Sequence, residues 1–279
     1  MKKITRRSFL AAAGLTAAAL ALTACGGSSS STASSTASSA AASSEAASSS
    51  AAAELTTVEA GKLTMATNAT FPPYEMTTDT GAFKGIDVDT AQAIAEKLGL
   101  ELQIDDMEFD AALLSVQQGK ADIVMAGVTV TDERKAVMDF SDSYATGIQS
   151  IIVPEGSDIA TPDDLAGKKI GTQRGTTGYI YCSDDFGDEN VVAYDSGLTA
   201  VQALNNGQVD AVVIDNAPAQ EYVAANPGLV VLDTSYAEED YAIGMAKGSA
   251  LEDAINAALE ELKADGTLQS IVDKYITAE

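Results

Sequence analysis

The order of apolar and polar positions predicts alternating strands and helices from about residue 62 onward. The run KLTMAT (62–67) is typical of a strand, and residues 87–98 carry apolar side chains at positions 91, 94, 95 and 98, on one face of a helix. Further strands are expected at 101–104 and 122–125, with a helix at 109–118 between them. This alternation is typical of βαβ units in a parallel sheet.

The same rhythm begins again after residue 149. We expect strands at 149–153, 168–172, 191–193, 210–214 and 241–245, and helices that begin at 161 and 176 or span 196–205, 216–225, 251–263 and 267–275. The segments VQQGKADIVMAG (116–127) and ALNNGQVDAVVID (203–215) share a helix end, a glycine, an aspartate and an apolar strand. This weak internal repeat favours two similar α/β lobes that meet at a cleft.

The first 54 residues follow a different pattern. Four basic residues precede an apolar stretch at 10–22, which predicts a secretory signal peptide over 1–24 rather than a membrane span. The pair Arg6-Arg7 resembles a twin-arginine export signal, although the general secretory route stays open. The sequence LTAC (22–25) resembles a lipobox, which predicts that Cys25 is lipidated. Residues 25–54 are mostly Ser and Ala, and we expect a flexible linker that spans roughly 30 Å.

The charge and the rare residue types exclude several classes of function. The chain has 41 acidic and 16 basic residues and a net charge of −25, which argues against binding to nucleic acid or to anionic lipid. It has no histidine, and Cys182 is the only cysteine after Cys25. Zinc sites and Ser-His or Cys-His nucleophiles therefore lack their parts, and we expect no metal or cofactor.

Arg134 stands in the first turn of a predicted helix, where the helix dipole disfavours positive charge. Thr131 is a suitable cap for this helix. Arg134 either is solvated and paired with Asp132, Glu133 or Asp139, or binds a carboxylate together with the helix start. In the second case Thr129 would add a hydroxyl and an N–H.

Asp215 presents a similar choice, because it follows an apolar strand and precedes a helix. It either caps that helix or faces the cleft and pairs with an ammonium group. In the second case, Arg134 and Asp215 would hold the two ends of an amino acid. The glycine-rich segment GTQRGTTG (171–178) is either a tight turn or an anion site at a helix start. Phe71, Tyr74 and Phe109 either pack in the core or line a ligand.

Six segments resemble the polar amino-acid solute-binding proteins of ABC importers, in the order of that family. They are ATNATFPPYE (66–75), FKGIDVDTAQAIAEKLG (83–99), ADIVMAGVTVTDERKAVMDFSDSY (121–144), DLAGKKIGTQRGTTG (164–178), VDAVVIDNAPAQEYV (209–223) and DGTLQSIVDKY (265–275). The resemblance implies a two-lobed α/β fold of the periplasmic-binding-protein type II, with two hinge strands. Lobe 1 would hold 55–145 and 240–279, and lobe 2 would hold 146–239.

The resemblance also implies a role for each site residue. Arg134, with the backbone of Thr129 and Thr176, would bind the α-carboxylate. Asp215, the Gly127 carbonyl and the Thr129 hydroxyl would bind the α-ammonium group. The remaining residues would surround the ligand's side chain: Phe71, Tyr74 and Phe109 as an aromatic enclosure, with Asn68 and Gln173 tuning the polarity. Several relatives have an aspartate at the position of Asn68, so a neutral polar ligand is favoured while cationic ones stay open.

The implied function is capture of a free amino acid and delivery to the transmembrane subunits of an ABC permease. We expect a monomer, not an enzyme, held to the outer face of the cell membrane by its lipid anchor alone, or periplasmic if the cell has two membranes. Two alternatives stay open. A dehydratase on the same fold would need catalytic carboxylates such as Glu75 or Asp79. A sensor would act as the partner of a separate signalling protein.

Overall fold

The computed structural model describes residues 55–276, and the predictions for the signal peptide, Cys25 and the linker concern residues outside this range. One sheet has five strands in the order β5–β1–β6–β14–β7. These strands are β1 (Lys62–Thr67), β5 (Glu101–Asp106), β6 (Ile123–Val124), β7 (Met138–Phe140) and β14 (Gly244–Ala246). β1 pairs in parallel with β5 and β6, because helices α1 (Ile86–Leu98) and α2 (Phe109–Gln117) return the chain between these strands.

A second sheet has the order β10–β9–β11–β8–β12, with β13 also paired to β8. Its strands are β8 (Ala145–Pro154), β9 (Ile170–Gln173), β10 (Val191–Tyr194), β11 (Ala211–Asp215), β12 (Leu229–Val231) and β13 (Ala237–Tyr241). β9 pairs in parallel with β10 and β11, and the helices α4 (Thr177–Phe186), α5 (Gly197–Asn205) and α6 (Asn216–Ala225) complete this part. We call the parts built on the first and second sheets the first and second lobes.

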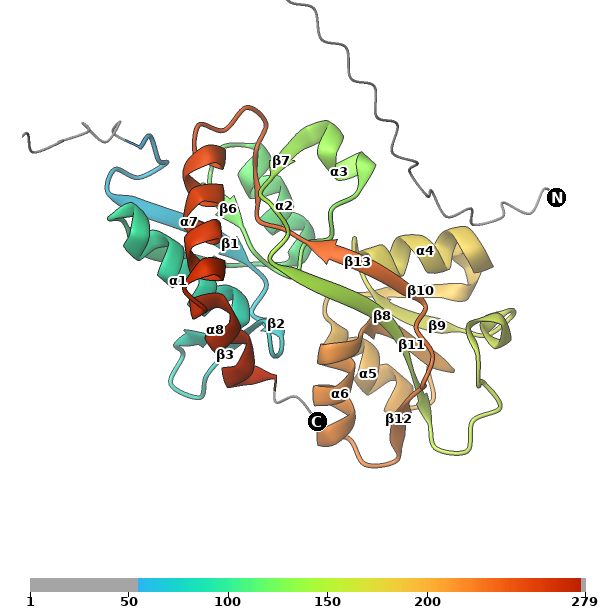
Figure 1. Cartoon of the computed structure of the whole chain (residues 1–279). Helices are drawn as coiled ribbons and strands as arrows, with labels where there is room; N and C mark the ends of the chain where they lie inside the picture. Colours follow the sequence, from blue (N-terminus) through green and yellow to red (C-terminus); the bar gives the residue numbers. More distant parts are fainter. Residues whose placement is uncertain (1–54, 277–279) are drawn as a thin grey trace, which may run out of the picture. The chain divides into compact units, whose positions relative to one another are not determined.

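Two antiparallel strands join the lobes. β8 carries the chain into the second lobe and β13 brings it back, with a register from Ala237 opposite Gln149 to Tyr241 opposite Ala145. The pair runs between the two sheets in Figure 1. This arrangement confirms the predicted two-lobed α/β fold with two hinge strands.

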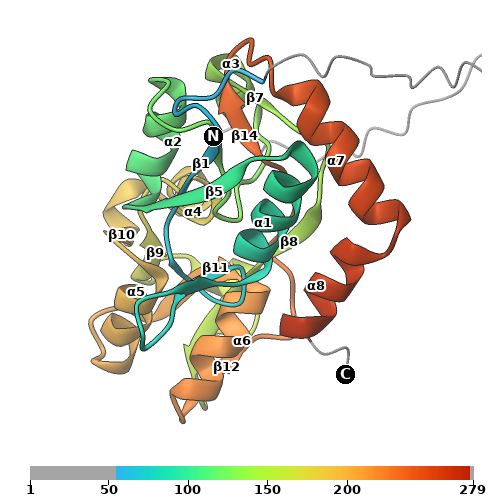
Figure 2. The ribbon, with the colours of Figure 1, turned by 90° about the vertical axis from the view of Figure 1, so that its left-hand side faces the viewer.

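The remaining elements cover the lobes. They are the small sheet of β2 (Thr70–Phe71), β3 (Glu75–Thr77) and β4 (Phe83–Lys84), the helices α3 (Asp132–Val137), α7 (Glu252–Ala264) and α8 (Thr267–Tyr275), and the 3₁₀ turns η1 (Pro162–Leu165) and η2 (Asp188–Asn190). Buried side chains of α7, such as Ile255 and Leu259, share a core with Ile94 of α1. Figure 2 shows α7 and α8 beside α1. Within residues 55–276, no helix is long and apolar enough to cross a membrane.

The predicted internal repeat corresponds to one local structure in each lobe. In the first lobe α2 ends before Gly119 and the chain enters β6, and in the second α5 ends before Gly207 and the chain enters β11. Both glycines have a positive φ, 66° and 67°, which explains why glycine ends each helix. The two lobes therefore reuse one helix–glycine–strand unit.

One predicted strand was wrong. Residues 241–245 were expected to form a single strand, whereas β13 ends at Tyr241 and β14 begins at Gly244. Tyr241 pairs with Ala145 in the hinge, and Gly244 pairs with Val124 and Phe140 in the first sheet. The chain changes sheets between these two residues, which an apolar run does not reveal.

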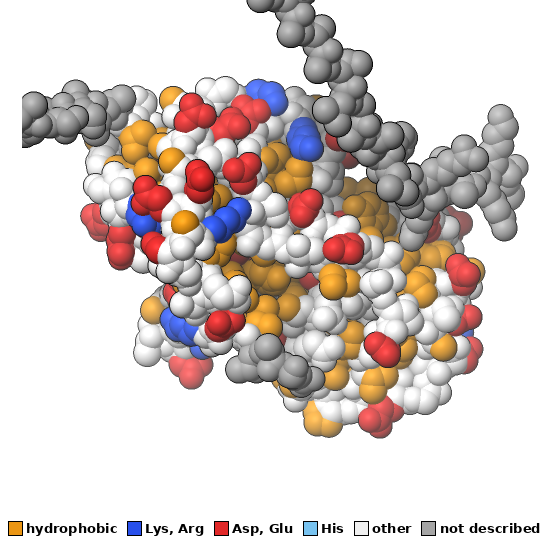
Figure 3. All heavy atoms as spheres, viewed as in Figure 1, with side chains coloured by type: hydrophobic (Ala, Val, Ile, Leu, Met, Phe, Trp, Pro, Cys, Tyr) orange, Lys and Arg blue, Asp and Glu red, His pale blue; other side chains and the backbone are white. Residues whose placement is uncertain are grey.

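Acidic side chains are spread over the face shown in Figure 3, and basic side chains are fewer there. This distribution agrees with the net charge of −25 of the whole chain. The face therefore offers no large basic surface of the kind that binds phosphates.

Candidate functional site

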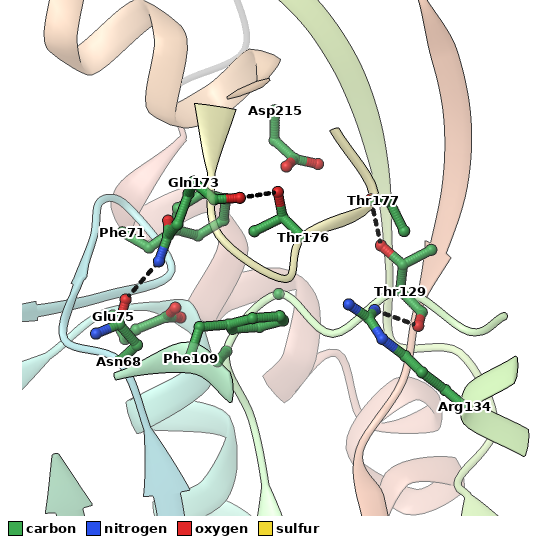
Figure 4. A pocket seen from close by; sticks show the side chains of 12 residues that line it. Asn68, Phe71, Glu75, Phe109, Thr129, Arg134, Gln173, Thr176, Thr177 and Asp215 are labelled. Atoms are coloured by element: carbon green, nitrogen blue, oxygen red, sulfur yellow. Dashed lines mark hydrogen bonds between the residues drawn. The ribbon is translucent and has the colours of Figure 1, made fainter. Parts of the chain in front are cut away.

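A pocket of about 320 Å³, part of it open to solvent, is lined by residues of both lobes (Figure 4). The lining residues are Asn68, Phe71, Glu75, Phe109, Ala126, Gly127, Thr129 and Arg134 from the first lobe, and Gln173, Thr176, Thr177 and Asp215 from the second. Every residue predicted for ligand binding is among them except Tyr74.

Arg134 is held at the pocket wall by α3. The hydroxyl of Thr131 accepts a hydrogen bond from the Arg134 N–H at 3.2 Å, as expected for an N-cap. The guanidinium donates to the carbonyls of Thr129 (2.8 Å) and Gly175 (3.2 Å) and lies 5.3 Å from the centre of the Phe109 ring. The side chain thus faces the pocket, where burial lowers its pKa from the usual value.

Asp215 ends β11 on the opposite side of the pocket from Arg134 in Figure 4. Its carboxylate does not cap α6. Instead it accepts hydrogen bonds from Gln149 Nε2 at 2.8 Å and from the hydroxyl of Tyr241, both on the hinge strands. Burial raises the pKa of Asp215 to about 7 against the opposing effect of these donors.

A second carboxylate, Glu239 of β13, contacts residues that line the pocket and was missed in the sequence. It is 6% exposed and accepts hydrogen bonds from Gln149 (3.0 Å), Thr177 (3.0 Å) and Thr129 (3.1 Å). Its donors come from the hinge and from both lobes. The alternation of side chains along a strand could have revealed it: Glu238 and Asp240 are exposed on one face of β13, so Glu239 between them points to the opposite face.

The aromatic residues divide into two layers. Phe71 and Phe109 line the pocket, whereas Tyr74 is buried behind Phe71, with its ring centre 5.9 Å from that of Phe71 and 5.3 Å from that of Tyr241. The prediction that Tyr74 surrounds the ligand is therefore not supported by its position. Tyr74 instead supports the pocket wall from behind.

Polar contacts connect the lobes around the pocket. Gln173 Nε2 donates to Asn68 Oδ1 at 2.9 Å, and the Arg134–Gly175 hydrogen bond also joins the two lobes. The hydroxyl of Thr176 donates to the Gln173 carbonyl at 2.8 Å and caps α4 by accepting from the Tyr179 N–H at 3.3 Å. The glycine-rich segment is therefore a turn that begins a helix at the pocket.

Glu75 is the least satisfied polar side chain of the site. It is fully buried, lines the pocket, and neither carboxylate oxygen has a hydrogen-bond donor among the described residues. Burial and the neighbouring Asp87 raise its pKa well above the usual value. Asp79, the other carboxylate considered for catalysis, is exposed and does not line the pocket.

Buried acidic groups outnumber buried cations at this site. Glu75, Asp87, Asp215 and Glu239 are all buried in or beside the pocket, and Arg134 is the one cation that lines it. An unpaired buried charge is costly. Burial of these carboxyl groups with a single cation is reflected in the raised pKa values of Glu75 and Asp215. Within residues 55–276, no group of three or more acidic or cysteine side chains is arranged to hold a metal ion.

Residues 63–278 match the family model of bacterial extracellular solute-binding proteins, family 3. The L-cystine-binding protein TcyJ of Escherichia coli is 34% identical over 79% of this chain and 85% of that protein. The structure of ArtJ, the arginine-, lysine-, histidine-binding protein of Geobacillus stearothermophilus, has a TM-score of 0.75 at 35% identity and covers 78% of this chain and 96% of that one. An ancestral arginine-binding protein bound to glutamine has a TM-score of 0.75 at 42% identity, with 78% and 99% covered.

Proposed function

Because this chain belongs to the bacterial extracellular solute-binding proteins of family 3, we propose that its pocket captures a free amino acid for an ABC importer. One observation carries the proposal: Arg134 of the first lobe and Asp215 of the second lobe are both buried and line the same pocket. A zwitterion compensates both charges at once. The relatives named for cystine, arginine, lysine and histidine bind ligands of this class.

The α-carboxylate is assigned to Arg134, with the backbone of Thr129 and Thr176 nearby. The planar guanidinium suits a carboxylate because it donates two parallel hydrogen bonds. The α-ammonium group is assigned to Asp215, the Gly127 carbonyl and the Thr129 hydroxyl. Contacts to both lobes make the bound ligand favour closure.

The side chain of the ligand is assigned to the space between Phe71, Phe109, Asn68, Gln173 and Glu75. We propose a cationic side chain, in place of the neutral polar one favoured by Asn68 alone. Glu75 supports this choice, because its buried carboxyl has no donor among the described residues and lies apart from Arg134 in Figure 4. The excess of buried carboxylates supports it as well.

The proposal extends to the cell surface. The protein is exported, anchored through a lipid on Cys25 and tethered by residues 25–54, so that it presents its ligand to the transmembrane subunits of the permease. The lobe boundaries proposed for this process are 55–145 with 240–279 for the first lobe and 146–239 for the second.

A thermal-shift screen of the protein against the common amino acids and cystine tests the proposal, followed by calorimetry on each hit. We expect arginine, lysine or ornithine to give the largest stabilisation, and glutamine and citrulline smaller ones. At a ligand concentration 100 times the Kd, stabilisation of the native state is about 2.7 kcal/mol. Absence of stabilisation by every amino acid contradicts the proposed function, and a preference for neutral ligands contradicts the cationic class alone.

A further inference from the structure

Two buried carboxyl groups, one of which lines the pocket, come from neighbouring elements of the first lobe. Glu75 comes from β3 and Asp87 from the first turn of α1, and both side chains are fully buried. The backbone N–H of Asp87 donates to the carbonyl of Tyr74, the residue before Glu75, at 2.9 Å, and the two carboxyl groups act on each other's pKa. Two carboxylates cannot hydrogen bond to each other unless one of them carries a proton.

Asp87 is the member of the pair that has donors for its charge, and these oppose the burial that raises its pKa to about 6. Its Oδ2 accepts hydrogen bonds from the Gly127 N–H at 2.9 Å and from the Tyr144 hydroxyl at 2.8 Å. It also stands in the first turn of α1, where the helix dipole favours negative charge. Its other oxygen, Oδ1, has no donor among the described residues, and neither has either oxygen of Glu75. A proton on Glu75 that is donated to Asp87 supplies the missing hydrogen bond.

The surroundings of Glu75 offer this proton no competing cation. The titratable groups that act on Glu75, or on which Glu75 acts, are Asp87 of α1, Asp106 of β5, Asp215 of β11, Tyr74 beside β3, Tyr144 before β8 and Tyr222 of α6. All of them are neutral or acidic. Arg134 interacts instead with Glu239, Asp110 and Asp215.

We propose that Glu75 holds a proton shared with Asp87 before the ligand enters, and releases it when the cationic end of the ligand binds there. The inference rests on the proposed function. In the step, the O–H bond of the Glu75 carboxyl breaks, the proton passes to the buffer, and the resulting carboxylate pairs with the ligand's cation. Asp87 keeps its charge and its two donors throughout. Binding of a cationic amino acid is therefore coupled to proton release, and its affinity rises with pH.

The direction of the pKa shifts agrees with this coupling. Burial, followed by the charge of Asp87, raises the pKa of Glu75, and a bound cation lowers it again. Between these two pKa values, ligand binding releases a proton. The pKa of Asp215 is raised to about 7, so the α-ammonium group also displaces some proton from Asp215. That contribution is common to all amino acids and has to be subtracted.

The experiment is calorimetry of the wild-type protein with L-arginine and with L-citrulline, its neutral near-isostere, in buffers of different ionisation enthalpy. The slope of the observed enthalpy against buffer ionisation enthalpy counts the protons released. At pH 7 we expect arginine to release more protons than citrulline, because only arginine brings a cationic side chain to Glu75. Equal slopes for the two ligands overturn the proton coupling while leaving the proposed function intact. If neither ligand binds and another neutral amino acid binds instead, both the proton coupling and the proposal of a cationic ligand are overturned.

The variant Glu75→Gln provides the matched test, because its amide can still donate to Asp87 but carries no titrating proton. We expect the arginine slope to fall to the citrulline slope and the pH dependence of arginine affinity to become flatter. If the slopes for arginine and citrulline still differ in this variant, the released proton comes from another group, and the proposed role of Glu75 is overturned. The comparison of the two ligands on the wild-type protein decides the question even if the variant does not fold.

Discussion

Replacing Arg134 by alanine tests the part of the site on which the proposed function depends most. The guanidinium is buried and fixed by the Thr129 and Gly175 carbonyls and by the Phe109 ring, so it needs little reorganisation to receive a carboxylate. Removing one partner of a buried charge pair costs roughly 2–5 kcal/mol of binding free energy, which is about a 30-fold to 4,000-fold rise in Kd. Arg134→Lys keeps the charge but loses the planar pair of donors, and we expect an intermediate loss.

Calorimetry with the best amino acid from the screen measures the effect. Arg174→Ala is the matched control, because Arg174 follows Gln173 directly but is exposed and makes a 3.5 Å ion pair with Asp195. Its removal should change the Kd by less than about fivefold. Unfolding by denaturant without ligand shows whether Arg134→Ala is folded; we expect a loss of about 1 kcal/mol, because two carbonyls lose their donor. A folded Arg134→Ala protein with wild-type affinity would refute the assignment of the α-carboxylate.

Three further changes probe closure, protonation and the hinge. A Cβ at Gly175, whose φ is 73°, would overlap the carboxylate of Asp110 in the other lobe, so Gly175→Ala should weaken ligand binding about tenfold or more. Calorimetry on the double variant Gly175→Ala/Asp110→Ala should show that part of the lost affinity is recovered. Burial raises the pKa of Asp215 to about 7, so the folded protein binds more protons than the unfolded chain between about pH 4 and 7, and the free energy of unfolding falls as the pH rises. Asp215→Asn should reduce this fall by roughly 2–4 kcal/mol, measured by urea unfolding at pH 5 and pH 8. An unchanged pH dependence contradicts the assignment of the raised pKa to Asp215. Glu239→Gln should raise the Kd about 10- to 100-fold, because the three groups that donate hydrogen bonds to the Glu239 carboxylate lose a charged acceptor. Unchanged affinity would mean that Glu239 only fills space.

The predictable part of the fold is the part with regular periodicity and clear ends. α1 has an apolar face and a glycine at its end, and it lies within one residue of its predicted start. The strands β2 and β4 have only two residues each, too few to show an alternation. The strand β7 follows α3 directly, and only its pairing with β14 makes it a strand. These strands form because they pair with segments that are distant in the sequence, and the local order of apolar and polar residues does not predict such pairing.

The site divides along the same line. The positions of Arg134 and Asp215 at the pocket were predictable because each residue has an unusual place in its own element, at a helix start and at a strand end. Tyr74 was predicted to contact the ligand but packs behind Phe71. The loop sequence shows that an aromatic residue is present, but not which of the two aromatic layers it joins. Its burial behind Phe71 depends on Tyr241, a residue more than 160 positions away.

Glu75 and Glu239 show why the number of buried carboxyl groups at the pocket was harder to predict than the position of the pocket. Each stands in a polar stretch, PYEMTT (73–78) and AEEDY (237–241), that is typical of a solvated surface. Both side chains are buried because one belongs to a small sheet under the pocket and the other to a hinge strand between the lobes. An excess of acid on the surface affects solubility, but the same excess in a pocket selects the charge of the ligand. The composition gives the total charge, and only the fold determines how much of that charge faces the pocket.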